Sequence, residues 1–212
     1  ASQGLTESGL TRLAEAEALR TQVPADSLVL VDAFSGISAA RRALQLLGVV
    51  PGTHISFETD ELACMIVGQH FQNVKELGDI TKATVTMLKQ AAADNPHANK
   101  ILLVAGFPCQ DLSGANRDAK GLDGSRSCLL FDTLDLLRDL LPQAFPGADI
   151  QAVLENVFSM KPEFRDLISS HCGTIPFKIC PSDVWPVLRP RLFWTTFNLD
   201  NHPHFELVEN DK

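Results

Sequence analysis

Short apolar runs separated by helical stretches constrain this chain more than any other feature. Residues 27–32, 101–105 and 150–154 are brief and largely apolar, which is typical of buried parallel strands. Residues 39–47 and 129–141 have the spacing of helices, and the second places five leucines on one face, as expected for core packing. This alternation predicts an α/β fold, a mostly parallel sheet with helices on both faces.

Composition sets limits that agree with this fold. The 212 residues are 45% hydrophobic and 21% charged, ordinary values for one sizeable domain. Five cysteines, an odd number without paired spacing, favour reduced thiols over disulfides or a zinc site. No apolar run reaches about eighteen residues and no secretory signal is present, so we expect an intracellular protein. We expect an amino-terminal helical extension at 1–27, a core at 28–200 and a polar acidic tail at 201–212.

Cys109 is a candidate nucleophile because of its position. It follows the 101–105 run in a loop, and open α/β sheets place their ligand crevices beyond the carboxyl ends of the strands. A thiol attacks only as thiolate, which nearby positive charge favours, and Arg191 could supply that charge. An isolated cysteine is more often a small buried hydrophobe. The flanking Pro108 and Gln110 and the distant polar partners favour the catalytic interpretation.

Those partners are a carboxylate and two guanidiniums. Glu155 ends the 150–154 run, where a carboxylate either caps the next segment or belongs to a site. Arg189 and Arg191 open a probable strand at 192–197, and side chains two apart on an extended segment point to the same side. A thiol, a carboxylate and two guanidiniums at strand ends are suited to attack on a pyrimidine ring.

The amino-terminal third has the pattern of a nucleotide pocket. Asp32 ends the first run, a turn containing Gly36 follows, and Glu58 ends a second probable strand at 54–58. In doubly wound folds an acidic residue about twenty positions after the first turn accepts hydrogen bonds from ribose hydroxyls. Glu58 and Asp79 could instead be helix caps.

Taken together, these segments resemble the DNA (cytosine-5) methyltransferases. The resemblance rests on Gly-Phe-Pro-Cys-Gln-Asp-Leu-Ser at 106–113, Leu-Glu-Asn-Val at 154–157 and Arg-Pro-Arg at 189–191, and extends over residues 28–197. The Arg-x-Arg-x-Phe-Trp form most resembles the de novo branch found in animals. The resemblance implies a Rossmann-like, S-adenosylmethionine-dependent methyltransferase fold.

It also implies a mechanism. The catalytic residues would be Cys109, Glu155, Arg189 and Arg191. Cys109 would add to carbon 6 of a cytosine flipped out of the stack, while Glu155 contacts the ring nitrogen and the exocyclic amine. Arg191 would hold the carbonyl oxygen, and carbon 5 would then accept the methyl group.

The methyl donor implied is S-adenosyl-L-methionine, bound by a Phe-x-Gly loop in which Ser38 stands where the family usually has glycine. The cofactor-binding residues would be Asp32, Phe34, Ser35, Gly36, Ile37, Glu58, Thr59, Asp79, Ile80, Gly106 and Pro108.

The implied substrate is double-stranded DNA. In the family, the polar loop at 116–127 closes over the DNA, and the substrate-binding residues would be Ser113, Asn116, Arg117, Lys120, Arg126 and Asn156. The net charge of −8 is unusual for a DNA-binding domain, which normally has an excess of Lys and Arg. A homologous methyltransferase or accessory subunit is a further possible partner. We expect the chain to bind neither a metal nor a membrane. The compartment would be the nucleus in a eukaryote and the cytoplasm in a bacterium.

Alternatives stay open at this point. Family members continue beyond residue 200 into a target-recognition domain and two further motifs, so we expect a truncated core. An RNA (tRNA) cytosine-5 methyltransferase could use the same core, and a non-catalytic regulatory homologue could act through a partner. A thiol hydrolase would need a histidine near Cys109, and none of the histidines considered, His54, His70, His97 and His171, has a recognisable catalytic context.

Overall fold

The computed structural model describes residues 27–108, 129–183, 186–197 and 206–208, and these residues form one eight-stranded sheet. The strand order is β3-β2-β1-β4-β5-β7-β6-β8. The parallel strands are β1 (Leu28–Ala33), β2 (Thr53–Phe57), β3 (Val74–Glu76), β4 (Lys100–Ala105) and β5 (Asp149–Val157). The antiparallel part comprises β6 (Phe177–Ile179), β7 (Arg191–Thr195) and β8 (Glu206–Leu207). The predicted mostly parallel α/β sheet is confirmed.

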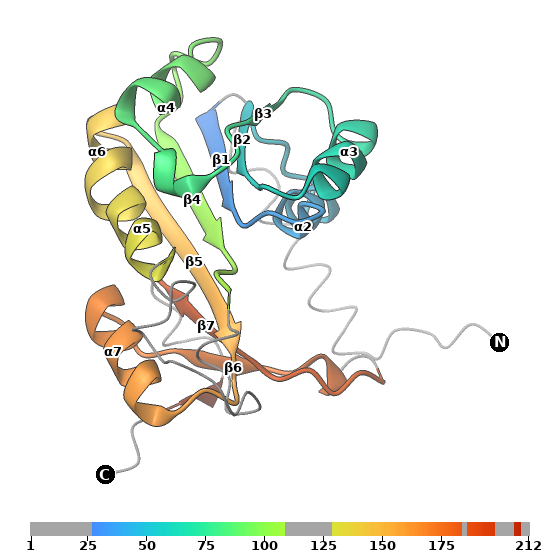
Figure 1. The fold of residues 1–212 in the computed structure, drawn as a ribbon, viewed down its shortest axis with the longest axis vertical. Helices are drawn as coiled ribbons and strands as arrows, with labels where there is room; N and C mark the ends of the chain where they lie inside the picture. The colour runs from blue at the N-terminus through green and yellow to red at the C-terminus, as the bar shows by residue number, and fades with distance from the viewer. Residues whose placement is uncertain (1–26, 109–128, 184–185, 198–205, 209–212) are drawn as a thin grey trace, which may run out of the picture.

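Helices cover both faces of the sheet (Figure 1). On one side lie α2 (Ala39–Leu46) and α3 (Glu61–His70). On the other lie α4 (Val85–Ala91), α5 (Leu129–Asp135) and α6 (Leu141–Ala144), with α7 (Pro162–Cys172) next to β7. Short 3₁₀ turns occur at Ile80–Lys82 (η2) and Pro181–Asp183 (η5).

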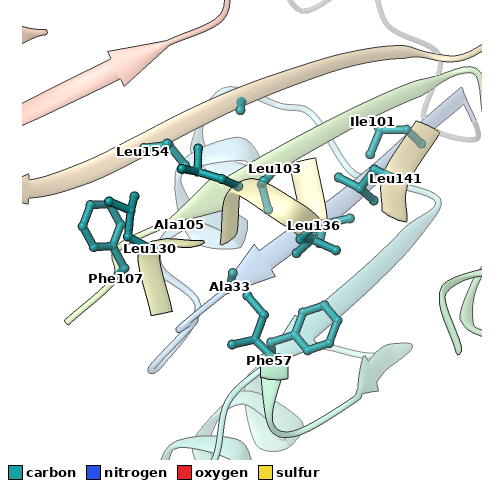
Figure 2. Packing of buried hydrophobic residues seen from close by; sticks show 14 of the residues in the cluster. Ala33, Phe57, Ile101, Leu103, Ala105, Phe107, Leu130, Leu136, Leu141 and Leu154 are labelled. Carbon is teal, nitrogen blue, oxygen red and sulfur yellow. The ribbon is translucent and has the colours of Figure 1, made fainter. Parts of the chain in front are cut away.

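The main core lies between the sheet and the α4, α5 and α6 layer. Leu130, Leu136 and Leu141 are fully buried, and Figure 2 shows Leu141 beside Ile101 of β4 and Leu130 beside Phe107. Burying such side chains stabilises a fold by roughly 1.5–3 kcal/mol each. This core fixes β4 and β5, and the candidate catalytic residue Glu155 lies near the carboxyl end of β5.

The single helix predicted at 129–141 is interrupted. A π-helical turn, Leu136–Leu140 (η4), separates α5 from α6, and the amide of Leu141 donates to the carbonyl of Leu136. Pro142 lies in the first turn of α6 and has no N–H to donate back to Arg138. The wider π-helical turn does not require the hydrogen bond that Pro142 cannot donate to Arg138.

Part of the predicted polar tail joins the sheet. Glu206–Leu207 pairs with β6 as β8, the amide of Val208 donates to the carbonyl of Pro176 at 2.9 Å, and Val208 packs against the core. Among the described residues, no helix is both long and apolar enough to cross a membrane.

Candidate active site

The turn between β1 and α2 has an unusual backbone. Phe34, Gly36 and Ser38 have positive φ angles of 57°, 51° and 58°. Glycine adopts this left-handed conformation freely, whereas a side chain makes it costly. The amide of Phe34 donates to the carbonyl of Phe57 at 2.8 Å, which ties the turn to the end of β2. Such bonds hold Phe34 in its strained conformation.

Glu58 fixes the same turn from the side of β2. Its Oε2 accepts from the amide of Gly36 at 2.8 Å, and its Oε1 accepts from the amides of Thr59 at 2.7 Å and Asp60 at 2.9 Å. A carboxylate offers about four lone-pair sites. One further hydrogen bond, such as one from a ribose hydroxyl, is therefore compatible with this geometry.

A pocket of about 490 Å³ opens beside Glu58, at the carboxyl ends of β1, β2 and β4. Six predicted cofactor-binding residues line it: Phe34, Glu58, Thr59, Asp79, Ile80 and Pro108. Four further lining residues were missed: Phe57, Gly78, Thr81 and Leu129. The volume is in the usual range for small-molecule sites.

Asp79 both caps a turn and lines the pocket. Its Oδ1 accepts from the amide of Thr81 at 3.0 Å and from the Thr81 hydroxyl at 2.8 Å. These bonds to Thr81 lower the pKa of Asp79, with a smaller contribution from Lys82. The carboxylate thus stays ionised as a hydrogen-bond acceptor at the pocket wall.

Five predicted cofactor residues do not line this pocket: Asp32, Ser35, Gly36, Ile37 and Gly106. Asp32 is buried behind the turn, with 4% of its surface exposed, and accepts from the Ser38 hydroxyl at 3.1 Å. Ile37 is 62% exposed and faces a separate hollow of about 780 Å³ beside α2 and α3. Ile37 therefore points away from the pocket, and Asp32 supports the turn from behind.

Glu155 and Arg191 form an ion pair at the carboxyl end of β5. Arg191 Nε lies 2.7 Å from Glu155 Oε1, because the antiparallel register sets Glu155 opposite Phe193 and Val157 opposite Arg191, so both side chains point to one face. Burial raises the pKa of Glu155, while the charges of Arg191 and Arg189 act against that rise. The site thus holds a partly desolvated carboxyl group beside a guanidinium, both still partly exposed.

The end of β4 joins this ion pair to the pocket. A Cβ on Gly106 would lie 3.2 Å from Glu155 Oε2, so the strand end approaches the carboxylate as closely as a glycine allows. Two residues on, Pro108 lines the pocket. The pocket and the Glu155–Arg191 pair are therefore adjacent.

Asn156, which was predicted to contact substrate, is buried in this structure. Only 1% of its surface is exposed; its amide nitrogen donates to the carbonyl of Phe107 at 3.1 Å, and its oxygen accepts from the amide of Val157 at 2.8 Å. Its neighbour Glu155 faces the site, and successive side chains of a strand point to opposite faces. Asn156 thus anchors the backbone that leads into Cys109.

Six predicted site residues lie outside the described part of the chain: Cys109, Ser113, Asn116, Arg117, Lys120 and Arg126. The predicted helical extension at 1–27 also lies outside it, except for Ser27. Arg189 is described and exposed, just before β7. Within the described residues, no group of three His, Cys, Asp or Glu side chains could hold a metal ion.

Solved structures share this fold. Methyltransferase EhMeth of Entamoeba histolytica superposes with a TM-score of 0.63 at 18% identity, covering 86% of this chain and 57% of that one. The Dnmt2 methyltransferase of S. pombe superposes with a TM-score of 0.50 at 17% identity, covering 79% of this chain and 48% of that one. The predicted Rossmann-like methyltransferase fold is confirmed.

Curated relatives match over about half to two thirds of the chain. Type II methyltransferase M.HpaII of Haemophilus parainfluenzae is 35% identical over 137 residues, 64% of this chain and 33% of that protein. DNA (cytosine-5)-methyltransferase DRM2 of Oryza sativa subsp. japonica is 30% identical over 110 residues, 49% of this chain and 18% of that protein. The chain spans a third or less of these two relatives.

The sequence profile of the family described as C-5 cytosine-specific DNA methylase matches residues 28–164. The match runs from β1 through β5 and so contains the pocket, Glu155 and Asn156. Because it spans well over half of the chain, the protein belongs to the C-5 cytosine-specific DNA methylase family.

Proposed function

We propose that this chain is the catalytic core of a DNA (cytosine-5-)-methyltransferase, which transfers a methyl group to carbon 5 of a flipped cytosine through a covalent Cys109 adduct. The observation that carries the proposal is the Glu155–Arg191 pair beside the pocket, joined to it by residues 106–108. In this proposal the core spans residues 28–200.

S-adenosyl-L-methionine is the cofactor of the family, and the pocket fits it. Phe34 would contact the adenine face, Glu58 would accept from the ribose hydroxyls, and Asp79 from the adenine amine. The fit rests on the volume of about 490 Å³ and on two acceptor carboxylates held by backbone amides. When bound, the cofactor supplies an electrophilic methyl group.

The protein's own residues act on the base. The Cys109 thiolate would form a bond to carbon 6, and the ring's electron pair would move toward the nitrogen that Glu155 contacts. A Glu155 carboxyl group with a raised pKa would donate a hydrogen bond to that nitrogen, while Arg191 binds the carbonyl oxygen. After methylation, a base removes the proton from carbon 5 and the bond to Cys109 breaks.

The chain has more acidic than basic residues, which disfavours DNA binding. With a net charge of −8, the chain should bind DNA weakly by itself. Arg117, Lys120 and Arg126 in the polar loop and Arg189 before β7 are our candidates for phosphate contacts.

The experiment that tests this function is calorimetric titration of the chain with S-adenosylmethionine. Micromolar binding is expected, with an at least roughly tenfold loss in Glu58→Ala because a charge-assisted hydrogen bond and the hold on Gly36 both disappear. Glu163→Ala, at an exposed position of α7, is the matched control and should bind like the wild type. Equal binding by both variants would contradict the assignment of Glu58. Failure of the wild type to bind would contradict the proposed function.

A second prediction concerns the close approach at Gly106. In Gly106→Ala, the new Cβ would meet Glu155 Oε2 at 3.2 Å, so the carboxylate has to shift. Methyl transfer to DNA should fall between about 10-fold and 100-fold, since small displacements at a reacting centre are costly. Gly68→Ala is the control: nothing lies within 4 Å of its added Cβ. Unchanged turnover in Gly106→Ala would mean that the position of Glu155 is not critical.

A further inference from the structure

Ser38 is an unusual residue for its position. It is fully buried, has a φ angle of 58°, and is the residue from which α2 begins. A serine at this position commonly caps the helix by accepting from an amide of the first turn, but Ser38 makes no such bond. Its hydroxyl instead donates to Asp32 Oδ2 at 3.1 Å, across the turn.

Asp32 is a buried hydrogen-bond acceptor. Its surface is 4% exposed, and the imidazole Nε2 of His54 lies 3.7 Å from Oδ2, beyond hydrogen-bond distance. Burial raises the pKa of Asp32, whereas His54 and Ser38 lower it and the charge of Glu58 raises it. Among the described side chains, Ser38 gives this carboxyl group a hydrogen bond at 3.1 Å.

The two ends of this bond enclose the turn. Asp32 is the last residue but one of β1, and Ser38 precedes α2, so the hydrogen bond closes residues 33–37 into a loop. Inside it, the amide of Ser38 donates to the carbonyl of Ser35 at 2.8 Å and the amide of Gly36 donates to Glu58. Phe34, the aromatic wall of the pocket, lies within this loop.

We propose that Ser38 is a positioning residue: its hydroxyl bond to Asp32 holds the turn, and with it Phe34 and the Gly36 amide, in the conformation that receives S-adenosylmethionine. Glycine would adopt the backbone of position 38 without strain. Serine accepts that strain, and the hydrogen bond offsets it. The inference rests on the proposed function for its ligand and goes beyond it in assigning Ser38 and Asp32 a joint role behind the pocket.

Three variants separate the hydroxyl from the backbone. Ser38→Ala removes the bond and keeps the strain, so the dissociation constant for S-adenosylmethionine should rise about tenfold, the usual cost of one hydrogen bond to a charged group. Ser38→Gly removes both and should weaken binding by a smaller but measurable factor. Asp32→Ala removes the acceptor of the same hydrogen bond and should weaken binding by a factor similar to that of Ser38→Ala.

A matched control removes a hydroxyl elsewhere. Ser169 in α7 donates to the carbonyl of Arg165 at 2.8 Å and accepts from Trp194 Nε1 at 3.0 Å, away from the turn. Ser169→Ala should lose some thermal stability while its dissociation constant for S-adenosylmethionine stays at the wild-type value. A purely structural role of Ser38 would give the same pattern.

Hydrogen exchange in ligand-free protein gives an independent readout. Amides of residues 34–38 should exchange several-fold faster in Ser38→Ala and Ser38→Gly, while those of β4 keep their protection. The inference is overturned if Ser38→Gly binds as tightly as the wild type, or if exchange in the turn is unchanged. If the wild type fails to bind the cofactor, the proposed function fails, and the exchange experiment alone decides whether Ser38 holds the turn.

Discussion

Replacing Glu155 with glutamine should lower methyl transfer to DNA by roughly 10²-fold to 10⁴-fold, the range associated with losing one general acid or base. Glutamine keeps the size of the side chain and can still reach the ring, but it has no carboxyl proton and no charge for Arg191. Because burial raises the pKa of Glu155, the carboxyl group keeps its proton to a higher pH than an ordinary glutamate. Single-turnover methylation of a DNA duplex measures the loss.

The pH profile tests the same assignment without relying on the size of the loss. The wild-type rate should carry a falling limb where Glu155 deprotonates, and the Glu155→Gln profile should lack that limb. Glu163→Gln in α7, whose side chain is 66% exposed, is the charge-matched control and should retain the wild-type profile. An unchanged rate in Glu155→Gln would show that the carboxyl group of Glu155 takes no part in the reaction.

The strands that carry a clear apolar pattern could be predicted from the sequence, whereas the shortest strands could not. The predicted strands at 27–32, 101–105 and 150–154 begin within one residue of β1, β4 and β5, because each is a largely apolar run. β3 has three residues, and β6 and β8 have three and two; they exist through pairing with neighbours and have too few side chains for a periodic signal.

Strand β5 shows where an apolar pattern misleads. Glu155 and Asn156 interrupt the run, so the sequence ends the strand at Leu154, yet β5 continues to Val157 by pairing with β7. That pairing buries Asn156 on one face and leaves Glu155 in the site on the other. The sequence alone could not show which of the two adjacent polar residues would face the candidate site and which would anchor the backbone.

The pocket shows the same limit. Glu58, Asp79 and Pro108 were found because each follows a strand or belongs to a motif. Leu129 was missed as a lining residue, since its helical spacing indicated only core packing. It reaches the pocket because α5 begins there, a contact between segments distant in sequence that no local pattern encodes.

Replacing Cys109 with serine should abolish turnover, with a loss of at least roughly a thousandfold, because a hydroxyl is far less nucleophilic than a thiolate near neutral pH. The thermal unfolding temperature and S-adenosylmethionine affinity should stay close to those of the wild type, since the pocket is lined by Pro108 and other described residues. Covalent trapping on DNA that contains a mechanism-based cytosine analogue, read by mass spectrometry, measures the adduct directly.

Another thiol makes this trapping experiment specific. Burial raises the pKa of Cys172 to about 11, so only about one molecule in a thousand carries its thiolate at pH 8. Cys172→Ser should therefore form the same DNA adduct as the wild type, whereas Cys109→Ser should form none. An adduct that persists in Cys109→Ser would locate the nucleophile elsewhere and contradict the proposed mechanism, even if the cofactor binds as expected. If only Cys109→Ser loses the adduct and its cofactor binding stays intact, Cys109 is needed for the chemical step and not for the cofactor pocket at the ends of β1, β2 and β4.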